Sequence, residues 1–130
     1  MFLNKFFHAA RKIHSQIREV GKIHLRSSKW GSVRDSFLEG NLFCAACGSH
    51  KHLQVHHVQP FHLNPALELD VTNLLVLCMD ELDCHLLLGH GDSFRCYNPN
   101  VREDVAKFRV SSKEEREIIV KLAKDNRLKD

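Results

Sequence analysis

The chain has 130 residues and a formal net charge of +3, a size that suits one compact domain. Hydrophobic residues make up 43% and charged residues 27%, a balance that excludes disordered, collagen-like and coiled-coil proteins. No apolar run approaches the roughly 18 residues of a membrane-spanning helix, and no secretory signal is recognisable at the N-terminus. We therefore expect a cytoplasmic protein without a membrane partner.

The charge is unevenly distributed along the chain. Lys and Arg exceed Asp and Glu by five in residues 1–40 and by two in residues 101–130, whereas acids are in excess by four in residues 41–100. A basic N-terminal region beside a mildly acidic centre rich in His and Cys suits a protein that holds a polyphosphate near a metal. The alternative is that these Lys and Arg side chains only solvate helices.

Two helices are predicted before residue 41. Apolar side chains recur every three or four positions in the first 20 residues, which predicts an amphipathic helix that packs on its own domain or on a partner. This stripe consists of Leu3, Phe6, Ala10, Ile13, Ile17 and Val20. Ser28 is expected to cap a second helix that runs to Gly40, with Trp30 as a packing residue. Three basic side chains nearby either contact phosphates or form a solvated face: Arg26, Lys29 and Arg34.

The central third of the chain is predicted to fold in the order strand, loop, strand, helix. Residues 53–58 and 73–78 have the composition and length of short strands. Residues 61–72 form a polar loop that contains an Asn-Pro pair, and the Leu-rich residues 81–90 are predicted to form a short helix. The expected fold class is therefore α+β.

A capping box predicts one more helix near the C-terminus. Ser112 is followed three positions later by Glu115, the pattern that begins a helix. The apolar face of this helix is expected to contain Ile118, Ile119 and Leu122. We expect a single domain with a helical N-terminal extension (1–40), a core (41–100) and a helical C-terminal extension (101–130).

Four of the five cysteines form two pairs. Cys44 and Cys47 form a knuckle whose two thiolates can bind one metal from a tight turn, and Cys78 and Cys84 follow further along the core. Four thiolates in two pairs predict a closed, tetrahedral Zn²⁺ site of the structural kind. In the alternative interpretation the second pair is only buried and the first pair is redox-active. Cys96 is expected to be a small buried side chain.

The histidines require a second explanation. His56 and His57 end the first predicted strand, Asn73 opens the second, and His85 follows a cysteine in the predicted helix. Adjacent residues on a regular strand point to opposite faces, so both histidines reach one site only if the strand bends near Pro60. A histidine pair, an Asn and a third histidine are more than a structural zinc site needs.

The ordered combination of these motifs resembles the HNH endonucleases of the ββα-metal (His-Me finger) group, and most closely the small phage and bacterial HNH proteins that carry a four-cysteine zinc site. It comprises Cys44-x2-Cys47, Leu53-Gln-Val-His-His-Val-Gln-Pro-Phe-His, Leu69-Asp-x2-Asn-Leu-x2-Leu-Cys78 and Cys84-His85-x4-His90. The resemblance covers roughly residues 26–100. The five-residue gap between Cys78 and Cys84 is its main departure from the usual pattern.

The resemblance implies a fold and a set of roles. The fold is a two-stranded antiparallel hairpin plus a helix, stabilised by zinc. His57 matches the general base, His56 and His85 match ligands of a catalytic divalent cation, and Asn73 matches the residue that braces the loop holding the base. His90 is a further candidate for the metal or the phosphate. The implied setting is a bacterial cell or a phage-infected host.

These residues also suit phosphodiester cleavage on chemical grounds. A neutral imidazole activates the nucleophile near pH 7, and one divalent cation stabilises the phosphoryl oxygens and the departing 3′ oxygen. Two-metal nucleases need several converging carboxylates, whereas Glu68 and Asp70 are the only acids between the histidine pair and Asn73. One metal with a histidine base is the better fit.

We therefore expect a metal-dependent DNA endonuclease that uses Mg²⁺, Mn²⁺, Ni²⁺ or a second Zn²⁺ and that nicks or cuts DNA. The alternative is a non-catalytic, zinc-stabilised module that binds DNA or protein. A redox protein built on Cys44 and Cys47 is a third, weaker alternative, because no βαβ pattern surrounds them. A homodimer, or a phage packaging or host complex, is a further possible partner.

Overall fold

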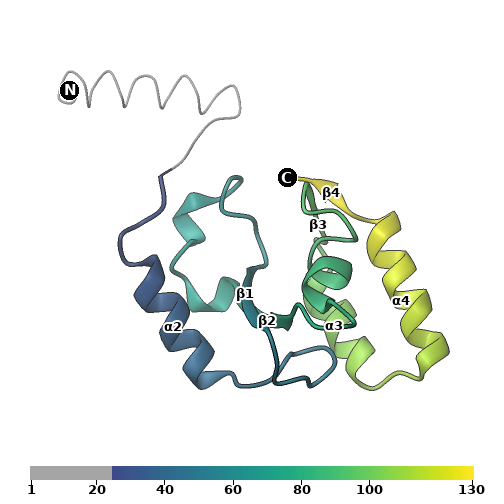
Figure 1. The fold of residues 1–130 in the computed structure, drawn as a ribbon. Helices are drawn as coiled ribbons and strands as arrows, with labels where there is room; N and C mark the ends of the chain where they lie inside the picture. The colour runs from purple at the N-terminus through teal and green to yellow at the C-terminus, as the bar shows by residue number, and fades with distance from the viewer. Residues whose placement is uncertain (1–24) are drawn as a thin grey trace.

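The computed structural model describes residues 25–130, so the helix expected over the first 20 residues lies outside the described part. Its elements run from one helix, through a small hairpin and a short helical turn, to a C-terminal pair of helices (Figure 1). In order they are α2 (Trp30–Gly40), β1 (Leu53–His57), η1 (Pro65–Leu67), η2 (Val71–Asn73), β2 (Leu74–Cys78), η3 (His85–Gly89), β3 (Cys96–Tyr97), α3 (Val101–Arg109), α4 (Lys113–Asp125) and β4 (Leu128–Lys129). The fold is α+β.

Strands β1 and β2 form an antiparallel hairpin close to the predicted bounds. Leu53 pairs with Cys78 and His57 pairs with Leu74, so the two histidines end one strand where the other begins. The predicted second strand began one residue earlier, but Asn73 closes the 3-10 turn η2 instead. The Asn73 side chain forms hydrogen bonds within the loop, and β2 therefore starts at Leu74.

Helix α2 begins later than expected. Ser28 was the predicted N-cap, but Lys29 occupies that position and makes no side-chain capping bond. Ser27 closes the preceding turn instead, since its carbonyl accepts from the Trp30 amide at 3.1 Å and its hydroxyl accepts from the Lys29 amide at 3.1 Å. The predicted end at Gly40 is confirmed.

The helix expected over residues 81–90 is shorter and of a different type. It is a five-residue π-helix, η3, that begins at His85 after a turn around Asp83. The Asp83 carboxylate accepts from the Leu86 amide at 3.1 Å and its carbonyl accepts from the Leu87 amide at 2.9 Å. These bonds fix the start of η3 directly after Cys84.

The two C-terminal helices, α3 and α4, pack against η3. Helix α3 was not predicted individually, although Val101, Val105 and Phe108 bury one of its faces. Helix α4 begins with the predicted Ser112–Glu115 capping box, and both of its reciprocal bonds are present. The buried face of α4 differs from the expected apolar face, because it is shifted by one position along the helix.

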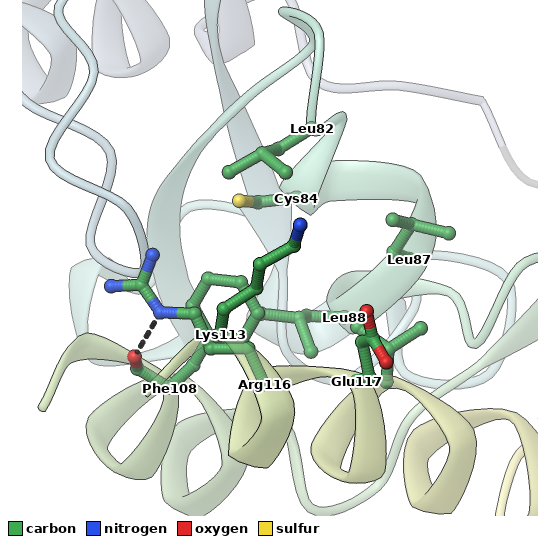
Figure 2. Close-up of a pocket in the computed structure, with 9 residues that line it drawn as sticks. Leu82, Cys84, Leu87, Leu88, Phe108, Lys113, Arg116 and Glu117 are labelled. Carbon is green, nitrogen blue, oxygen red and sulfur yellow. Dashed lines mark hydrogen bonds between the residues drawn. The ribbon is translucent and has the colours of Figure 1, made fainter. Parts of the chain in front are cut away.

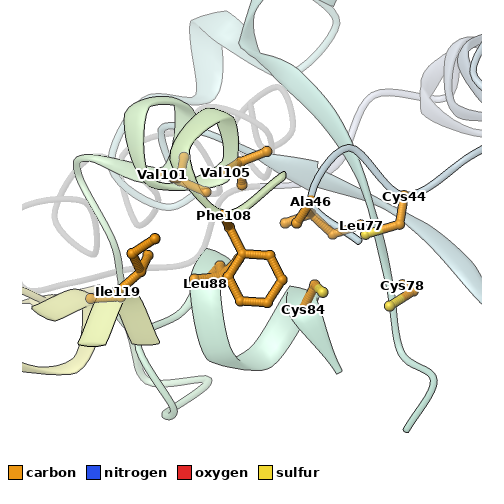
Figure 3. Close-up of a cluster of buried hydrophobic side chains, with 11 residues drawn as sticks. Cys44, Ala46, Leu77, Cys78, Cys84, Leu88, Val101, Val105, Phe108 and Ile119 are labelled. Carbon is orange, nitrogen blue, oxygen red and sulfur yellow. The ribbon is translucent and has the colours of Figure 1, made fainter. Parts of the chain in front are cut away.

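On α4 the buried residues are Ile119 and Ala123, whereas Ile118 and Leu122 are 60% and 49% exposed. The buried face of α4 is rotated relative to the expected face, because Ile119 and Ala123 pack against the core. The small Ala123 side chain permits a close approach of the helix to the core. The core contains three of the cysteines together with Leu77, Leu88 and Phe108 (Figure 3). Cys96 is buried, as expected.

The short pair β3 and β4 was not predicted either. Cys96 pairs with Lys129 and Tyr97 pairs with Leu128, so the end of the described chain lies beside residues 96–97. Within residues 25–130, no helix has both the length and the hydrophobicity to cross a membrane.

Candidate functional site

The four predicted cysteines converge. The Sγ atoms of Cys44, Cys47, Cys78 and Cys84 all lie within 4.8 Å of one another, and 3.6 Å separates those of Cys47 and Cys78. The knuckle closes through a hydrogen bond from the Gly48 amide to the Cys44 carbonyl, at a φ of +82° that favours glycine. The cluster is therefore compatible with a structural zinc site.

The electrostatics of the cluster fit a cation. The hydrogen bond from Cys84 lowers the pKa of Cys44 to about 4, whereas burial raises the pKa of Cys47 to about 11. The pKa of Cys84 is also raised, by its hydrogen bond to Cys44 and by burial. Four thiolates this close together need a positive ion between them. Zn²⁺ in tetrahedral thiolate coordination meets that need.

Three histidines form a second group of potential metal ligands. The ring centroids of His56, His85 and His90 are 4.9 to 5.0 Å apart in every pair, and their ligand atoms lie within 4.8 Å of one another. His56 comes from β1, His85 is the first residue of η3, and His90 directly follows the last residue of η3. We call these three residues the histidine trio.

The π-helix explains how His85 and His90 meet. Residues five positions apart on an α-helix of 3.6 residues per turn point about 140° away from each other. A π-helix closes its turn over five residues and brings such a pair to the same side. As a result, the Nε2 atoms of His85 and His90 are 3.3 Å apart.

The hydrogen bonds of the trio leave two ring nitrogens without a partner. His90 is not one of the two residues concerned, because its Nδ1 donates to the Cys96 carbonyl at 2.7 Å and its Nε2 faces His85 Nε2 at 3.3 Å. His56 Nε2 and His85 Nδ1 are buried without any hydrogen-bond partner. Burial lowers the pKa of His85 to about 4 and that of His56 well below its usual range. Buried imidazole nitrogens without a hydrogen-bond partner, as in His56 and His85, fit a divalent cation.

His57 has different surroundings from its neighbour. Its ring packs on Trp30 at 4.6 Å between centroids, and Nε2 donates to the Glu68 carbonyl at 3.0 Å. This bond leaves the Nδ1 lone pair available to accept a proton. Burial, and to a smaller extent the charge of Arg26, lowers the pKa of His57 below its usual value. The ring is therefore neutral near pH 7, as a general base requires.

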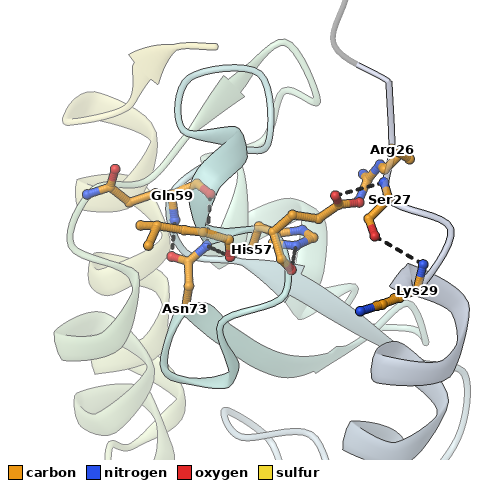
Figure 4. A network of polar contacts seen from close by, with 8 residues as sticks. Arg26, Ser27, Lys29, His57, Gln59 and Asn73 are labelled. Carbon is orange, nitrogen blue, oxygen red and sulfur yellow. Dashed lines mark hydrogen bonds and ion pairs between the residues drawn. The ribbon is translucent and has the colours of Figure 1, made fainter.

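The carbonyl that orients His57 is itself held in place. The buried Glu68 carboxylate accepts from Arg26 at 3.2 Å and from the Ser27 amide at 3.0 Å (Figure 4). The Arg26 guanidinium also lies over the Phe61 ring, 4.5 Å from its centroid. Sequence reasoning missed Glu68, because a single acid in a polar loop carries no pattern that distinguishes it.

Asn73 joins the two ends of the loop between the strands. Its Oδ1 accepts from the Gln59 amide at 2.8 Å, and its Nδ2 donates to the carbonyls of Gln59 and Leu67 at 3.1 and 3.3 Å (Figure 4). The side chain is buried, with 6% exposure. These contacts place Asn73 behind the loop that carries the Glu68 carbonyl.

The trio and His57 line one cavity of about 200 Å³. Of the three basic residues singled out from the sequence, Arg26 lines this cavity and the other two do not. Arg34 forms an ion pair with its neighbour Asp35 at 2.8 Å, and Lys29 is exposed at the start of α2. The structure therefore brings one of these cations to the site.

Two further residues shape the trio and were not predicted. Gly89 has no side chain to displace, and a Cβ built there would lie 3.0 Å from two atoms of the His56 ring. Phe94 packs on His90 and His85, with centroids 4.9 and 5.8 Å away. The sequence contained no sign of this close approach, since it depends on His56, a residue from a distant strand.

A larger cavity of about 540 Å³ lies between α4 and the start of η3 (Figure 2). Apolar side chains such as Leu87, Leu88 and Val120 form its walls, with Lys113 and Glu117 beside them. It contains no histidine and is separate from the cavity of the trio.

Comparison with known proteins adds no further information on function. No protein-family model, curated protein or solved structure matches this chain. The structure itself provides an α+β fold, a two-stranded antiparallel hairpin and a four-cysteine cluster compatible with zinc. The functional argument therefore starts from the side chains of the two clusters and the cavity.

Proposed function

We propose that the protein is a metal-dependent DNA endonuclease of the HNH type, which hydrolyses phosphodiester bonds with one metal ion and a histidine base. One observation carries this proposal. The histidine trio and His57 line the same cavity, yet the trio has unpartnered nitrogens suited to a cation while His57 is oriented to accept a proton. A structural module has no need of both arrangements.

Two metal ions have different roles in this proposal. The four cysteines hold Zn²⁺ in a closed site that stabilises the fold. His56, His85 and His90 hold a catalytic divalent cation, which is Mg²⁺, Mn²⁺, Ni²⁺ or a second Zn²⁺. When bound, that cation supplies positive charge for the phosphoryl oxygens and the departing oxygen.

His57 performs the proton transfer. Its Nδ1 accepts a proton from a water molecule as the water oxygen attacks phosphorus and the bond to the 3′ oxygen breaks. The departing 3′ oxygen takes a proton from solvent water, so the products carry a 5′ phosphate and a 3′ hydroxyl. The bond to the Glu68 carbonyl fixes the tautomer, and the Trp30 ring restricts rotation of the imidazole.

The DNA backbone is the substrate that fits the cavity and its surroundings. A volume of about 200 Å³ admits a phosphodiester and its adjoining sugar atoms rather than a whole base pair. Arg26 provides a positive charge at the cavity wall, and residues 1–40 carry the excess of basic residues that DNA binding requires.

Cleavage of supercoiled plasmid by zinc-loaded protein tests the proposal. Reactions with Mg²⁺, Mn²⁺ or Ni²⁺ are compared with EDTA and with the His57→Ala variant. We expect nicked or linear DNA that depends on both the added metal and His57. Folded, zinc-containing protein that binds DNA in a gel-shift assay but cleaves it with no metal would favour the non-catalytic binding module instead.

A further inference from the structure

One fully buried amide lies beside the end of η3, and no part of the proposed function uses it. Among the described residues, Asn98 is the one polar side chain with 0% exposure. It lies between β3 and α3, in an Asn98-Pro99-Asn100 stretch whose composition predicts a turn. A buried amide requires hydrogen-bond partners, so the partners of Asn98 show what this side chain holds in place.

Asn98 holds the end of η3. Its Nδ2 donates to the Leu88 carbonyl at 2.9 Å, and its backbone amide donates to the Gly89 carbonyl at 3.0 Å. Carbonyls in the last turn of a helix have no partner within that helix, so bonds from another segment decide where they point. Asn98 satisfies the two carbonyls that directly precede His90.

The remaining bonds of this side chain anchor it at the start of α3. Nδ2 also donates to the Asp104 carboxylate at 2.8 Å, and Oδ1 accepts from the Asn100 amide at 2.9 Å. Both N–H groups of the Asn98 side-chain amide are therefore used, one toward η3 and one toward α3. The side chain is fixed between the two helices.

The segment that carries Asn98 also orients a member of the trio. Cys96 lies two residues earlier, and its carbonyl accepts from His90 Nδ1 at 2.7 Å. One short segment thus binds both the His90 ring and the carbonyls that precede it. On the other side of the same turn, a Cβ at Gly89 would lie 3.0 Å from the His56 ring. A shift at the end of η3 would therefore change the position of His90 and the space for His56.

The trio depends on the unusual type of this helix. An α-helical turn over the same residues would point His85 and His90 about 140° apart, whereas the observed π-helix brings their Nε2 atoms to 3.3 Å. Isolated π-turns are rare, so contacts from outside the helix must favour the wider turn. The bonds from Asn98 are such contacts, at the end where His90 follows.

We propose that Asn98 is a positioning residue of the histidine trio. Through its bond to the Leu88 carbonyl, the side chain keeps η3 in the π-turn that brings His90 to the other two histidines. This inference rests on the proposed function, because it takes the trio as a metal site. Asn98 acts through the backbone of η3 and needs no contact with the metal or the DNA.

Ni²⁺ binding to the zinc-loaded, full-length protein separates positioning from folding. The main variant combines Asn98→Asp with Asp104→Asn, which exchanges the donor and the acceptor of one hydrogen bond and so keeps the link to α3. In this variant the Leu88 carbonyl loses its donor. Asp104→Asn alone is the matched control, because its amide oxygen still accepts from Asn98 and the bond to Leu88 stays. Calorimetry measures the Ni²⁺ affinity, and the visible absorption bands of bound Ni²⁺ report its coordination geometry.

We expect the double variant to keep its zinc and its cooperative thermal transition but to bind Ni²⁺ about tenfold more weakly, the loss typical of groups that support a metal ligand. Its Ni²⁺ absorption bands should shift, whereas Asp104→Asn should match wild type in affinity and bands.

Two further variants keep the test decisive if the double variant loses its zinc. Asn98→Ser removes the amide donors and keeps an acceptor for the Asn100 amide, so its Ni²⁺ affinity should also fall about tenfold. Val105→Ala removes a buried apolar contact of α3 and no hydrogen bond, so it shows what a loss of stability does alone. It should bind Ni²⁺ within about threefold of wild type, a smaller loss than that of a supporting group.

Two results would overturn the inference, and they differ in what else they remove. If wild type binds a second ion that His85→Ala loses, but the Asn98 variants bind Ni²⁺ as tightly as Asp104→Asn and Val105→Ala, Asn98 does not position the trio and the proposed function stands. If wild type binds no ion beyond zinc and is indistinguishable from His85→Ala, the trio is not a metal site and both proposals fail.

Discussion

The four-cysteine cluster and the histidine trio have similar geometry but different surroundings. In each group the potential ligand atoms lie within 4.8 Å of one another. Cys44, Cys78 and Cys84 belong to the hydrophobic core, whereas the trio borders a cavity shared with His57. Both groups are largely buried, so burial alone does not separate them. They differ in their neighbours, because apolar core side chains surround the cysteines whereas Arg26 and His57 line the cavity beside the histidines.

The two groups also depend on each other unequally. Cys84 immediately precedes His85, so the turn that delivers a ligand to the trio is anchored in the cysteine cluster. Loss of the cluster should therefore disturb the trio. Loss of a histidine should leave the cluster intact, because its four cysteines come from the knuckle, β2 and the residue before η3.

Cys44→Ser should produce the largest effect and tests this asymmetry directly. Structural zinc contributes an apparent binding free energy of about 10–16 kcal/mol in small zinc domains, as large as the whole stability of such a fold. We expect the variant to lose zinc and its cooperative thermal transition. His85→Ala should retain both. Zinc content and circular dichroism measure these outcomes, and a stable, zinc-free Cys44→Ser protein would contradict the structural assignment.

If the proposed function holds, His57→Ala should remove DNA cleavage while leaving the four cysteines and the histidine trio in place. A positioned general base contributes about 10²- to 10⁴-fold to the rate, so plasmid cleavage should fall by that factor. Zinc content and metal binding by the trio should stay at wild-type values. His50→Ala is the matched control, since His50 is exposed and outside the cavity. Cleavage by His57→Ala near the wild-type rate would remove His57 as the base.

Asn73→Ala should have a moderate effect on stability. It leaves the buried partners of the Asn73 side chain without their hydrogen bonds, at a cost of about 1–3 kcal/mol for each unsatisfied group. We expect a total loss of about 2–4 kcal/mol in urea unfolding, since some groups find water. Asn64→Ala, which removes one exposed bond to Gln59, should cost less than about 0.5 kcal/mol. Equal losses in the two variants would show that the loop does not depend on Asn73.

The sequence predicted the central hairpin well and the helices less well. Strand residues 53–58 and 73–78 were bounded by Pro60 and by a polar loop, and such local signals set the ends of β1 and β2. The stripe on α4 was displaced because hydrophobicity favours Ile118 over Ala123, whereas packing favours the smaller side chain. Tertiary contacts, not local composition, decided this face.

The candidate site was predictable where its members have distinctive side chains. Cysteines and histidines in ordered spacings mark both groups, but nothing in the spacing of His85 and His90 specifies a π-helix. The contribution of Glu68 also escaped notice, because its carbonyl and carboxylate act through contacts with segments distant in sequence. Residue types that occur everywhere on protein surfaces give no such signal.

Gly89→Ala should have the smallest effect and probes how tightly the trio is packed. A methyl group 3.0 Å from the His56 ring must displace it slightly, and that ring is confined by His85 and His90. We expect Ni²⁺ affinity to fall by about three- to tenfold, the lower range for a disturbed ligand. Gly31→Ala is the control, since a Cβ at Gly31 in α2 meets nothing within 4 Å. It should raise stability by up to about 1 kcal/mol and leave Ni²⁺ binding unchanged. Unchanged affinity in Gly89→Ala would mean that the trio adjusts to the methyl group and that its metal binding does not depend on the close approach of Gly89 to His56.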